Sequence, residues 1–474
     1  MSATLMISVS GMRGHVGTDL TPELVTRHAA ALGSWARSQG KPTVVLGRDS
    51  RTSGPMFAHA AMAGLMSVGV DVIDLGIVPT PTVQMAVEEH HAGAGLILTA
   101  SHNPIEWNAL KFVGPDGIFL DGEAGAAVRA LAEKGPVRNG WEGLGVVRED
   151  AGALQRHFAH ILRLPMIDVE KIRARRFRVA LDCVRGAGGR SIPALLEQLG
   201  CEVHGINLET DGRFPRAPEP IPENLVELGK LVRDTKADIG MAVDPDVDRL
   251  ALVDETGTPP GEDYTLAFAV RTVLEWASAQ RQPDRHGAPA GSTSRWGAGT
   301  PPTVVVNLST SLVVEDAARD YGARFVRAPV GEANVARAMR DEGALIGGEG
   351  NGGVMLPALH IGRDAPLGVA LILQMLAGSR VPVSQLVSQH PRYTIVKAKG
   401  PRGAELRPLY DALRRRFPDA DADERDGLRL SWRDRWLHVR PSGTEPIIRY
   451  IAEAPTAVDA ESLVGAAQEM VHKE

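Results

Sequence analysis

Cysteine is almost absent from this chain: Cys183 and Cys201 are the only two among 474 residues. They lack the close paired spacing of a metal site, and they lie in apolar stretches that favour buried thiols in a reducing compartment. No segment approaches the roughly 18 apolar residues that span a bilayer. The first residues, MSATLMISVSGMRG, have no basic start followed by an apolar run. These absences predict a cytoplasmic protein without disulfides and without a membrane partner.

A block of basic residues is missing as well. The 52 Lys and Arg residues are scattered along the chain, and the formal net charge is −6. We therefore expect no nucleic-acid partner and a small-molecule ligand instead. A chain of 474 residues exceeds the usual domain size several times, so several domains are expected. The sequence leaves open whether the protein is a monomer or a homodimer.

One pattern occurs three times: an apolar strand, a turn of small polar residues, a helix, and a glycine before the next strand. The copies run from TVVLGRDSRTSG to Gly69, from RVALDCVRGAGG to Gly200, and from TVVVNLSTS to Gly322. A glycine at that place commonly ends a helix. The repetition predicts three related α/β domains with mixed, largely parallel sheets.

The pattern changes after about residue 376, where shorter polar–apolar alternations and one helical stretch at 404–416 predict a smaller α+β domain. We expect four domains around one central cleft, at 1–155, 156–261, 262–376 and 377–474. Residues 280–302 are rich in Gly, Pro, Ser and Arg and have no periodicity. They predict a flexible surface insertion without a catalytic role.

Each repeated domain has a second apolar strand that runs directly into a loop of unusual composition. The three loops are GLILTASHNP, ADIGMAVDPDVDR and ALIGGEGNGG. Ligands bind at the carboxyl ends of strands in open parallel sheets. We therefore expect these three loops to face one cleft.

Asp244, Asp246 and Asp248 form the strongest signal. Three carboxylates two residues apart in an extended segment fall on one side and repel one another unless a cation joins them. Carboxylates without His or Cys select magnesium over zinc. A solvated acidic turn is the alternative, but a third carboxylate, Pro245 and the adjacent Arg249 favour a Mg²⁺ site.

Ser101 ends a strand beside Pro104, where a hydroxyl can project into a cleft as a nucleophile. Most loop serines only cap helices or make turns, so this position alone decides little. No Ser-His-Asp order or nucleophile elbow surrounds it. We therefore interpret His102 as a hydrogen-bonding support for the loop and not as a base.

The segment VRPSGTEPIIRYIAEA near the carboxyl end suits an oxyanion, because guanidinium groups, two hydroxyls and a Ser-Gly-Thr backbone turn lie close together. A plain Ser-Gly hairpin is the alternative. The candidate anion ligands are Arg440, Ser442, Gly443, Thr444 and Arg449.

The glycine-rich segment GGEGNGG is either a flexible turn or a sugar-binding loop. In the second case Glu349 and Asn351 are suited to hydrogen-bond sugar hydroxyls. The residues alone leave both possibilities open.

Together these segments resemble the α-D-phosphohexomutase superfamily over almost the whole chain. The resemblance rests on SGMRG at 10–14, TASHNP at 99–104, DPDVDR at 244–249, GEGNGG at 348–353 and RPSGTEP at 440–446, with GRDSRTSG and PEPIPENL between them. It implies a phosphoserine at Ser101, which also contributes to the Mg²⁺ site of the three aspartates. It further implies a phosphate clamp in the carboxyl-terminal loop and active-site cations at Arg13, Lys111 and Arg249.

Two segments depart from the superfamily pattern. Where many relatives read GEMSGH or GEQSGH, this chain has Asn351 for serine and Gly353 for histidine, so any proton-transfer role of that histidine is lost. Ser8-Val9-Ser10 replaces the familiar FGT. With SHNPIEWNALKF and GRDAPLG, these features are most similar to the archaeal-type phosphoglucosamine mutase branch.

The resemblance implies an isomerase that interconverts hexose 6-phosphate and hexose 1-phosphate through the phosphoserine and a bisphosphorylated sugar, with hexose 1,6-bisphosphate as activator. Glucosamine 6-phosphate is the expected substrate. Phosphomannomutase or phosphoglucomutase activity is the first alternative. A phosphoserine phosphatase and a non-catalytic sugar-phosphate-binding protein are more distant ones.

Overall fold

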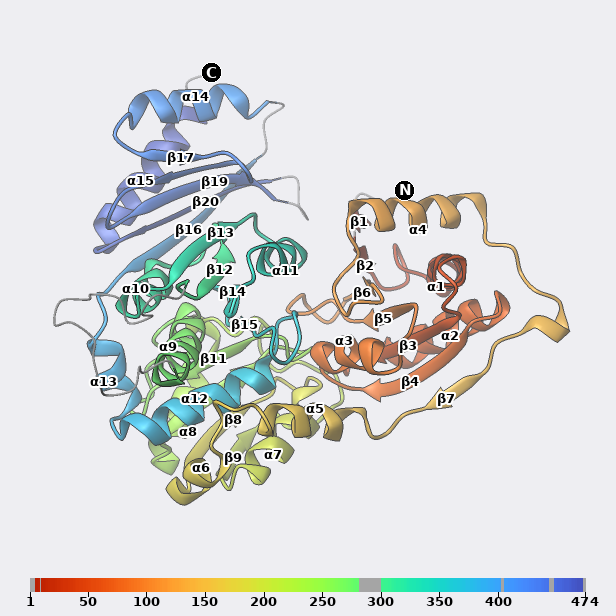
Figure 1. Cartoon of the computed structure of the whole chain (residues 1–474). Coiled ribbons are helices and arrows are strands. Elements are labelled where there is room, and N and C mark those ends of the chain that lie inside the picture. The colour runs from red at the N-terminus through yellow and green to blue at the C-terminus, as the bar shows by residue number, and fades with distance from the viewer. Residues whose placement is uncertain (1–4, 9, 281–299, 402–404, 443–446, 472–474) are drawn as a thin grey trace.

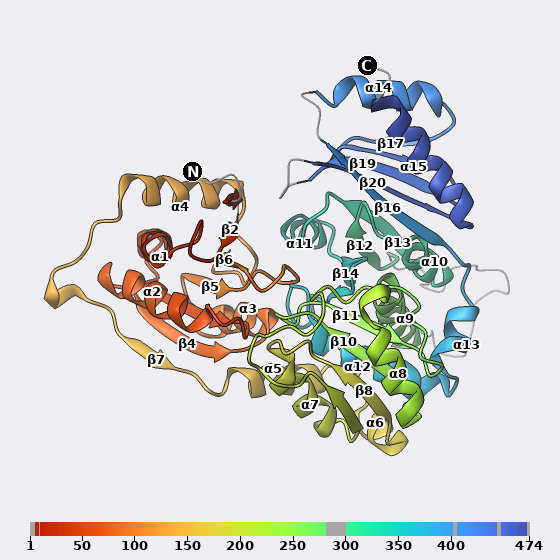
Figure 2. The same ribbon diagram turned by 180° about the vertical axis from the view of Figure 1, so that it is seen from behind.

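Four β-sheets organise the chain in this computed structural model, which describes residues 5–8, 10–280, 300–401, 405–442 and 447–471. Figures 1 and 2 show the first sheet in one lobe, the second and third together in a neighbouring lobe, and the fourth stacked beyond the third. The insertion predicted at 280–302 lies almost wholly outside the described residues. No helix in the described part of the chain is long and apolar enough to cross a membrane.

The first sheet has seven strands in the order β1-β2-β6-β5-β3-β4-β7, and its half from β5 to β7 is parallel. The strands are β1 Met6–Ser8, β2 Gly11–His15, β3 Thr43–Arg48, β4 Asp71–Ile77, β5 Ala94–Leu98, β6 Trp107–Val113 and β7 Val147–Glu149. Helices α1 Pro22–Ser38, α2 Gly54–Ser67 and α4 Gly122–Lys134 share an apolar core on one face, and α3 Thr80–Glu89 covers the other.

The second and third sheets have four strands each, in the orders β11-β10-β8-β9 and β13-β12-β14-β15. Their strands are β8 Arg178–Asp182, β9 Glu202–Ile206, β10 Ile239–Val243, β11 Leu250–Val253, β12 Thr303–Asn307, β13 Arg324–Ala328, β14 Ile346–Glu349 and β15 Gly353–Met355. Their helices are α5 Ala153–Leu162, α6 Val169–Arg175, α7 Gly188–Gln198, α8 Val226–Thr235, α9 Asp263–Gln280, α10 Leu312–Asp320, α11 Glu332–Asp341 and α12 Ala365–Ser379.

The predicted threefold repetition is confirmed. In every copy the first strand, which is largely buried, pairs in parallel with the strand after the helix, as β3 with β4, β8 with β9 and β12 with β13. Gly69, Gly200 and Gly322 follow the helices with φ of 75°, 73° and 66°, a left-handed conformation that glycine adopts without strain. The strand that leads into the predicted loop of each copy is β5, β10 or β14. It pairs in parallel with the first strand of the copy, on the side away from β4, β9 or β13.

The second and third sheets share one apolar core. Its members include Leu181 and Met241 under the second sheet and Val304 and Ile346 under the third. Helix α12 follows the third sheet in sequence yet packs on α5, α6 and α7 beside the second sheet. Where one of these two domains ends and the other begins therefore stays a prediction.

The fourth sheet is antiparallel throughout and corrects one expectation. Its order is β16-β20-β19-β18-β17, with β16 Thr394–Pro401, β17 Asp421–Asp423, β18 Leu428–Ser431, β19 Trp436–Pro441 and β20 Ile447–Ala454. It follows the short helix α13 Val383–Ser388. Two helices cover it, α14 Arg407–Arg416 and α15 Ala457–Val471, whereas the sequence analysis predicted only the first. The buried positions 460, 463, 464 and 467 of α15 carry the helical period that the prediction overlooked.

Candidate active site

The three predicted loops meet at one cleft. Ser101 follows β5, the aspartates follow β10, and Glu349 ends β14. A cavity of about 510 Å³ lies above them, and its wall includes all four predicted catalytic residues, Ser101, Arg13, Lys111 and Arg249. The parallel strands thus bring together side chains that lie far apart in the sequence, as expected at their carboxyl ends.

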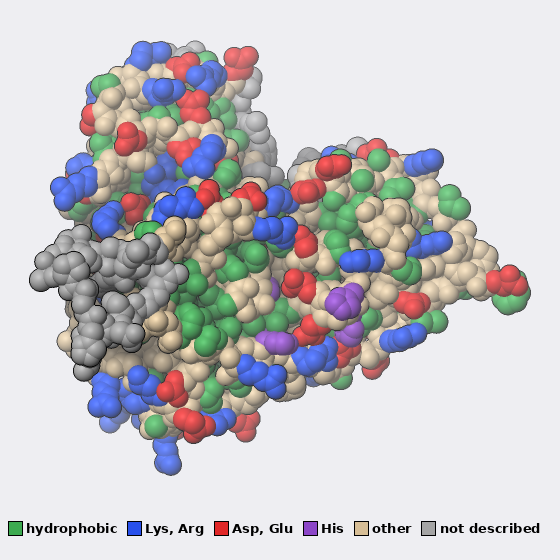
Figure 3. Space-filling view, viewed as in Figure 1, with side chains coloured by type: hydrophobic (Ala, Val, Ile, Leu, Met, Phe, Trp, Pro, Cys, Tyr) green, Lys and Arg blue, Asp and Glu red, His purple; other side chains and the backbone are tan. Residues whose placement is uncertain are grey.

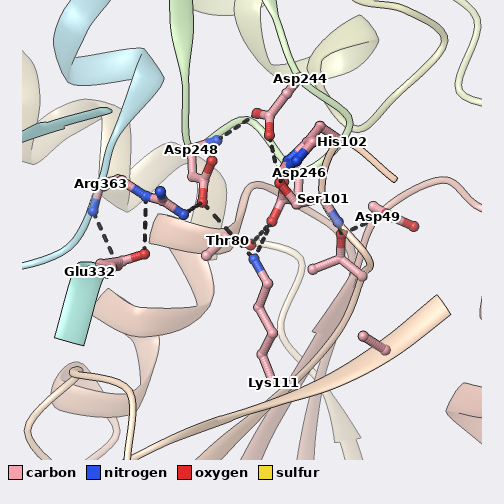
Figure 4. Close-up of polar contacts among 12 residues, drawn as sticks. Asp49, Thr80, Ser101, His102, Lys111, Asp244, Asp246, Asp248, Glu332 and Arg363 are labelled. Atoms are coloured by element: carbon pink, nitrogen blue, oxygen red, sulfur yellow. Dashed lines mark hydrogen bonds and ion pairs between the residues drawn. The ribbon is translucent and has the colours of Figure 1, made fainter. Parts of the chain in front are cut away.

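The Ser101 hydroxyl points at the aspartate loop. Its Oγ donates a hydrogen bond to Asp244 Oδ2 at 2.9 Å, and the side chain is buried (Figure 4). Ser101 has a φ of +49°, a left-handed conformation that is uncommon outside glycine. Such strain persists only where surrounding contacts enforce it, and it gathers at functional sites.

Arg51 supplies those contacts and was missed from the sequence. Its buried guanidinium donates to the carbonyl oxygens of Ser101 at 2.7 Å and Asn103 at 2.6 Å, and also to those of Pro104 and Trp107. Asp49 holds the same guanidinium at 3.0 Å. Both residues belong to GRDSRTSG, where an arginine two positions after a strand-end aspartate was the available signal.

The three aspartates form a compact, buried carboxylate cluster. Ligand oxygens of Asp244, Asp246 and Asp248 lie within 4.8 Å of one another. Asp246 Oδ1 and Asp248 Oδ1 are buried and accept no hydrogen bond from any described residue. Val247 between them has a φ of +60°, an outlier for a β-branched residue. Buried carboxylate oxygens without partners, in an all-oxygen set, fit a Mg²⁺ ion.

Electrostatics divides the aspartates. Burial, reinforced by the neighbouring Asp248 and Asp246, raises the pKa of Asp244 well above its usual range. Burial also acts to raise the pKa of Asp246, but Lys111 Nζ at 2.7 Å overrides it and holds that pKa below the usual range. Thr80 Oγ1 donates to the same Asp246 oxygen at 2.9 Å and ties the aspartate loop to the start of α3.

Cations surround the serine. Arg13 Nη1 donates to Asn103 Oδ1 at 2.8 Å. Arg249 lies near Glu219 and Asp248, with nitrogen–oxygen distances of 3.6 and 3.7 Å. Burial and the nearby guanidinium groups lower the pKa of His102 well below its usual range, and its Nδ1 lies 3.3 Å from the Ser101 hydroxyl oxygen. The interpretation of His102 as a support for the loop and not as a base stays a prediction.

Glu349 is anchored more firmly than the sequence suggested. Its Oε1 accepts hydrogen bonds from Asn307 Nδ2 at 2.8 Å and the Gly331 N–H at 2.9 Å, and its Oε2 accepts one from Arg363 at 2.7 Å. Asn351 turns its Oδ1 to the Gly353 N–H at 3.2 Å. The proposed contacts of Glu349 and Asn351 with a sugar stay predictions.

The carboxyl-terminal sheet contributes a row of cations. Arg440, Arg449 and Lys399 lie directly opposite one another on β19, β20 and β16. Asp426 Oδ2 accepts a hydrogen bond from Arg440 Nε at 3.0 Å and offsets part of this positive charge, and a bound anion would add to that compensation. Ser442 is buried, while Gly443 and Thr444 lie outside the described residues. Figure 3 shows a notch between the lobe that carries this sheet and the lobe of the first sheet.

The described residues that line the 510 Å³ cavity come from the first three sheets and their loops, and Arg440, Ser442 and Arg449 are not among them. This arrangement leaves room for a ligand with two ends. One end would meet the serine and the carboxylates, and the other the row of cations.

A strained serine against three buried carboxylates, opposite a row of cations, defines an enzyme of phosphoryl transfer. The chain belongs to the phosphoglucomutase/phosphomannomutase family, within the α-D-phosphohexomutase superfamily, and is therefore an isomerase. Models of the family's three α/β/α domains match residues 5–138, 155–257 and 289–393, and the model of its C-terminal domain matches 395–469.

Relatives match over nearly their whole length. A probable phosphoglucosamine mutase of Methanopyrus kandleri is 36% identical over 96% of this chain and 95% of its own. A phosphoglucomutase/phosphomannomutase of Thermococcus kodakarensis is 36% identical over 94% and 93%. Among solved structures, a Burkholderia thailandensis protein of the phosphoglucomutase/phosphomannomutase family matches with a TM-score of 0.79 at 25% identity, covering 98% of each chain.

Proposed function

We propose that this protein is a Mg²⁺-dependent phosphohexomutase that converts glucosamine 6-phosphate to glucosamine 1-phosphate through a phosphoserine at Ser101. The contact between Ser101 Oγ and Asp244, inside a cleft floored by three buried carboxylates, carries this proposal. A glucosamine substrate is supported by several relatives at 31–36% identity that are described as phosphoglucosamine mutases.

In the proposed reaction the bond between phosphorus and Ser101 Oγ breaks as a bond forms to the free hydroxyl oxygen of a bound sugar monophosphate. The sugar bisphosphate turns in the cleft, and its other phosphate returns to Ser101. Hexose 1,6-bisphosphate can recharge an unmodified serine by the same step. The row formed by Arg440, Arg449 and Lys399 would hold the phosphate that does not react.

The chain's own residues prepare this transfer. Arg51 fixes the serine loop, and the cations Lys111, Arg13 and Arg249 line the cleft where negative charge gathers on the phosphoryl group. Asp244, Asp246 and Asp248, with an oxygen on Ser101, would hold Mg²⁺. That ion supplies positive charge which offsets the charge of the transferred group.

Two other functions were weighed. A phosphatase with the same residues would pass the phosphoryl group to water, which domains closing around the cleft would exclude while the intermediate turns. A non-catalytic binding protein would need neither the nucleophile nor the carboxylate cluster. A mutase accounts for the nucleophile, the carboxylate cluster and the second, cationic subsite together, and each alternative leaves at least one of them unexplained.

Intact mass spectrometry separates these functions. We expect a fraction of the purified protein to be about 80 Da heavier than the sequence mass, because a resting mutase keeps its phosphoserine. The added mass should map to Ser101 and should still be present after turnover of sugar monophosphate, because each cycle returns a phosphoryl group to the serine. A protein without this fraction, even after incubation with hexose 1,6-bisphosphate, would contradict the proposal.

Substrate choice can be tested with purified sugars. We expect kcat/KM for glucosamine 6-phosphate to exceed the values for glucose 6-phosphate and mannose 6-phosphate. The expectation rests on the relatives that are described as phosphoglucosamine mutases, because the cations that line the cleft give a 2-ammonium group no electrostatic advantage. The three values should be measured with a bisphosphate activator present. A glucose or mannose value tenfold above the glucosamine value would reverse the substrate assignment and leave the mutase class intact.

A further inference from the structure

Arg363 gathers carboxylates from three separate segments. Its Nη2 donates to Asp248 Oδ2 at 2.6 Å, and its Nε forms an ion pair with Glu332 Oε2 at 3.1 Å (Figure 4). Its Nη1 donates to Glu349 Oε2 at 2.7 Å. These partners belong to the aspartate loop, the end of β14 and the start of α11. One planar guanidinium therefore fixes the metal site relative to the glycine-rich loop.

The side chain of Arg363 occupies space that a residue at position 353 would need. A Cβ atom on Gly353 would lie 2.3 Å from Arg363 Cδ and 2.8 Å from its Cγ, distances that real side chains do not tolerate. The missing side chain and the buried arginine are thus two parts of one arrangement.

The main chain of Arg363 is held from the side away from the cleft. Asp364 caps α12 by accepting from the Leu367 N–H at 2.8 Å, and its other oxygen contacts His157 Nε2 at 2.8 Å and His360 Nε2 at 3.0 Å. All three polar side chains are buried. His157, on α5, also contacts Thr82 on α3. The hydrogen bonds around Asp364 therefore connect α3 of the first sheet, α5 beside the second sheet and the segment that follows the third sheet.

From this geometry we infer that Arg363 is a positioning residue that couples the glycine-rich sugar loop to the metal site. The inference rests on the proposed function. A ligand that displaces the Glu349 side chain also displaces Asp248, because a rigid guanidinium is hydrogen-bonded to the two carboxylates at 2.7 and 2.6 Å. Occupancy of the sugar subsite and the geometry of the aspartates therefore change together.

Arg363→Lys is the first test, because lysine keeps the charge and loses the planar fork. We expect kcat to fall about 10- to 100-fold, the usual effect of removing a group that orients metal ligands, with a smaller change in KM. Arg216→Lys is the matched control. That arginine is also mostly buried and pairs with Asp182 at 2.7 Å, but it does not line the cleft. An Arg363→Lys enzyme with kcat within threefold of wild type would overturn the positioning role.

Binding measurements test the coupling without relying on turnover. Mn²⁺ replaces Mg²⁺ as a spectroscopic probe, and its dissociation constant is measured by electron paramagnetic resonance with and without saturating glucosamine 6-phosphate. By linkage, coupled sites give a ratio of the two constants that differs from one. We expect at least a fivefold difference in wild type and in Arg216→Lys, and a ratio within twofold of one in Arg363→Lys. A ratio that is unchanged by the substitution would overturn the inference.

The exchange of space is tested with Gly353→His and Arg363→Ala. Each single change should lower kcat, the first through the clash with Arg363 and the second through loss of the three-way anchor. In the double variant the Arg363 atoms that a side chain at position 353 would strike are gone, so we expect the two losses not to add and kcat to stay within threefold of that of Arg363→Ala. A double variant whose loss of kcat equals the product of the two single losses contradicts the steric link between the two positions. If the wild-type protein shows no mutase activity on any hexose phosphate, the proposed function is contradicted instead.

Discussion

Replacing Ser101 with alanine is expected to lower kcat by at least about a thousandfold, because the change deletes the atom that carries the phosphoryl group. The fold should survive. The lost contacts are the hydrogen bond to Asp244 and the contact with His102, while Arg51 continues to hold the backbone carbonyl of residue 101. Steady-state kinetics with glucosamine 6-phosphate and bisphosphate activator measure the effect.

Ser191→Ala is the matched control for this change. Ser191 is a buried serine on α7 whose hydroxyl donates to the Ala187 carbonyl oxygen at 3.2 Å, away from the cleft. Its kcat should stay near the wild-type value, and both variants should show similar thermal unfolding. A Ser101→Ala enzyme within tenfold of wild type would require another phosphoryl carrier.

Asp246→Asn is expected to lower kcat by at least about a hundredfold and to raise the Mg²⁺ concentration at half-maximal activity at least about tenfold. The amide keeps the shape of the side chain but removes one of three anionic ligands. It also weakens the contact with Lys111, which lies 2.7 Å from the carboxylate. Activity measured over a range of Mg²⁺ concentrations tests both effects.

Asp182→Asn serves as the control for the charge change. Asp182 is buried like Asp246 and pairs with Arg216 at 2.7 Å, but it is outside the carboxylate cluster. Its Mg²⁺ dependence should match that of wild type. If Asp246→Asn also keeps the wild-type Mg²⁺ curve, the metal is bound elsewhere.

The sequence predicted the features whose signals are local. Each repeated unit is recognised by an apolar strand, a polar turn and a glycine. Asp244, Asp246 and Asp248 are recognised by their spacing of two residues. The repetition placed each loop at the carboxyl end of a strand in its own sheet, and the meeting of the three loops in one cleft depends on how the three sheets pack together. The period of α15 was equally local, but two of its four buried positions, 460 and 467, are alanines, which made the helix harder to recognise.

The sequence could not predict the residues whose role arises from distant contacts. Arg51 reaches carbonyl groups about 50 residues away, and Arg363 reaches Asp248 across 115 residues. Arginines are common on protein surfaces, so neither stood out before folding placed it among buried acceptors. Glu349 was found, but its contacts with Asn307 and the Gly331 N–H depend on the packing of the third sheet.

The apolar core that runs under both the second and the third sheet has a thermodynamic consequence. If either sheet unfolds, the side chains of the other sheet lose their packing partners in the shared core. The second and third sheets are therefore expected to unfold in a single cooperative transition. The first and fourth sheets each have a large apolar cluster of their own and can open separately. The aspartates and Glu349 therefore belong to one cooperative unfolding unit. Ser101 belongs to a second unit, in the first sheet, and the row of cations to a third, in the fourth sheet.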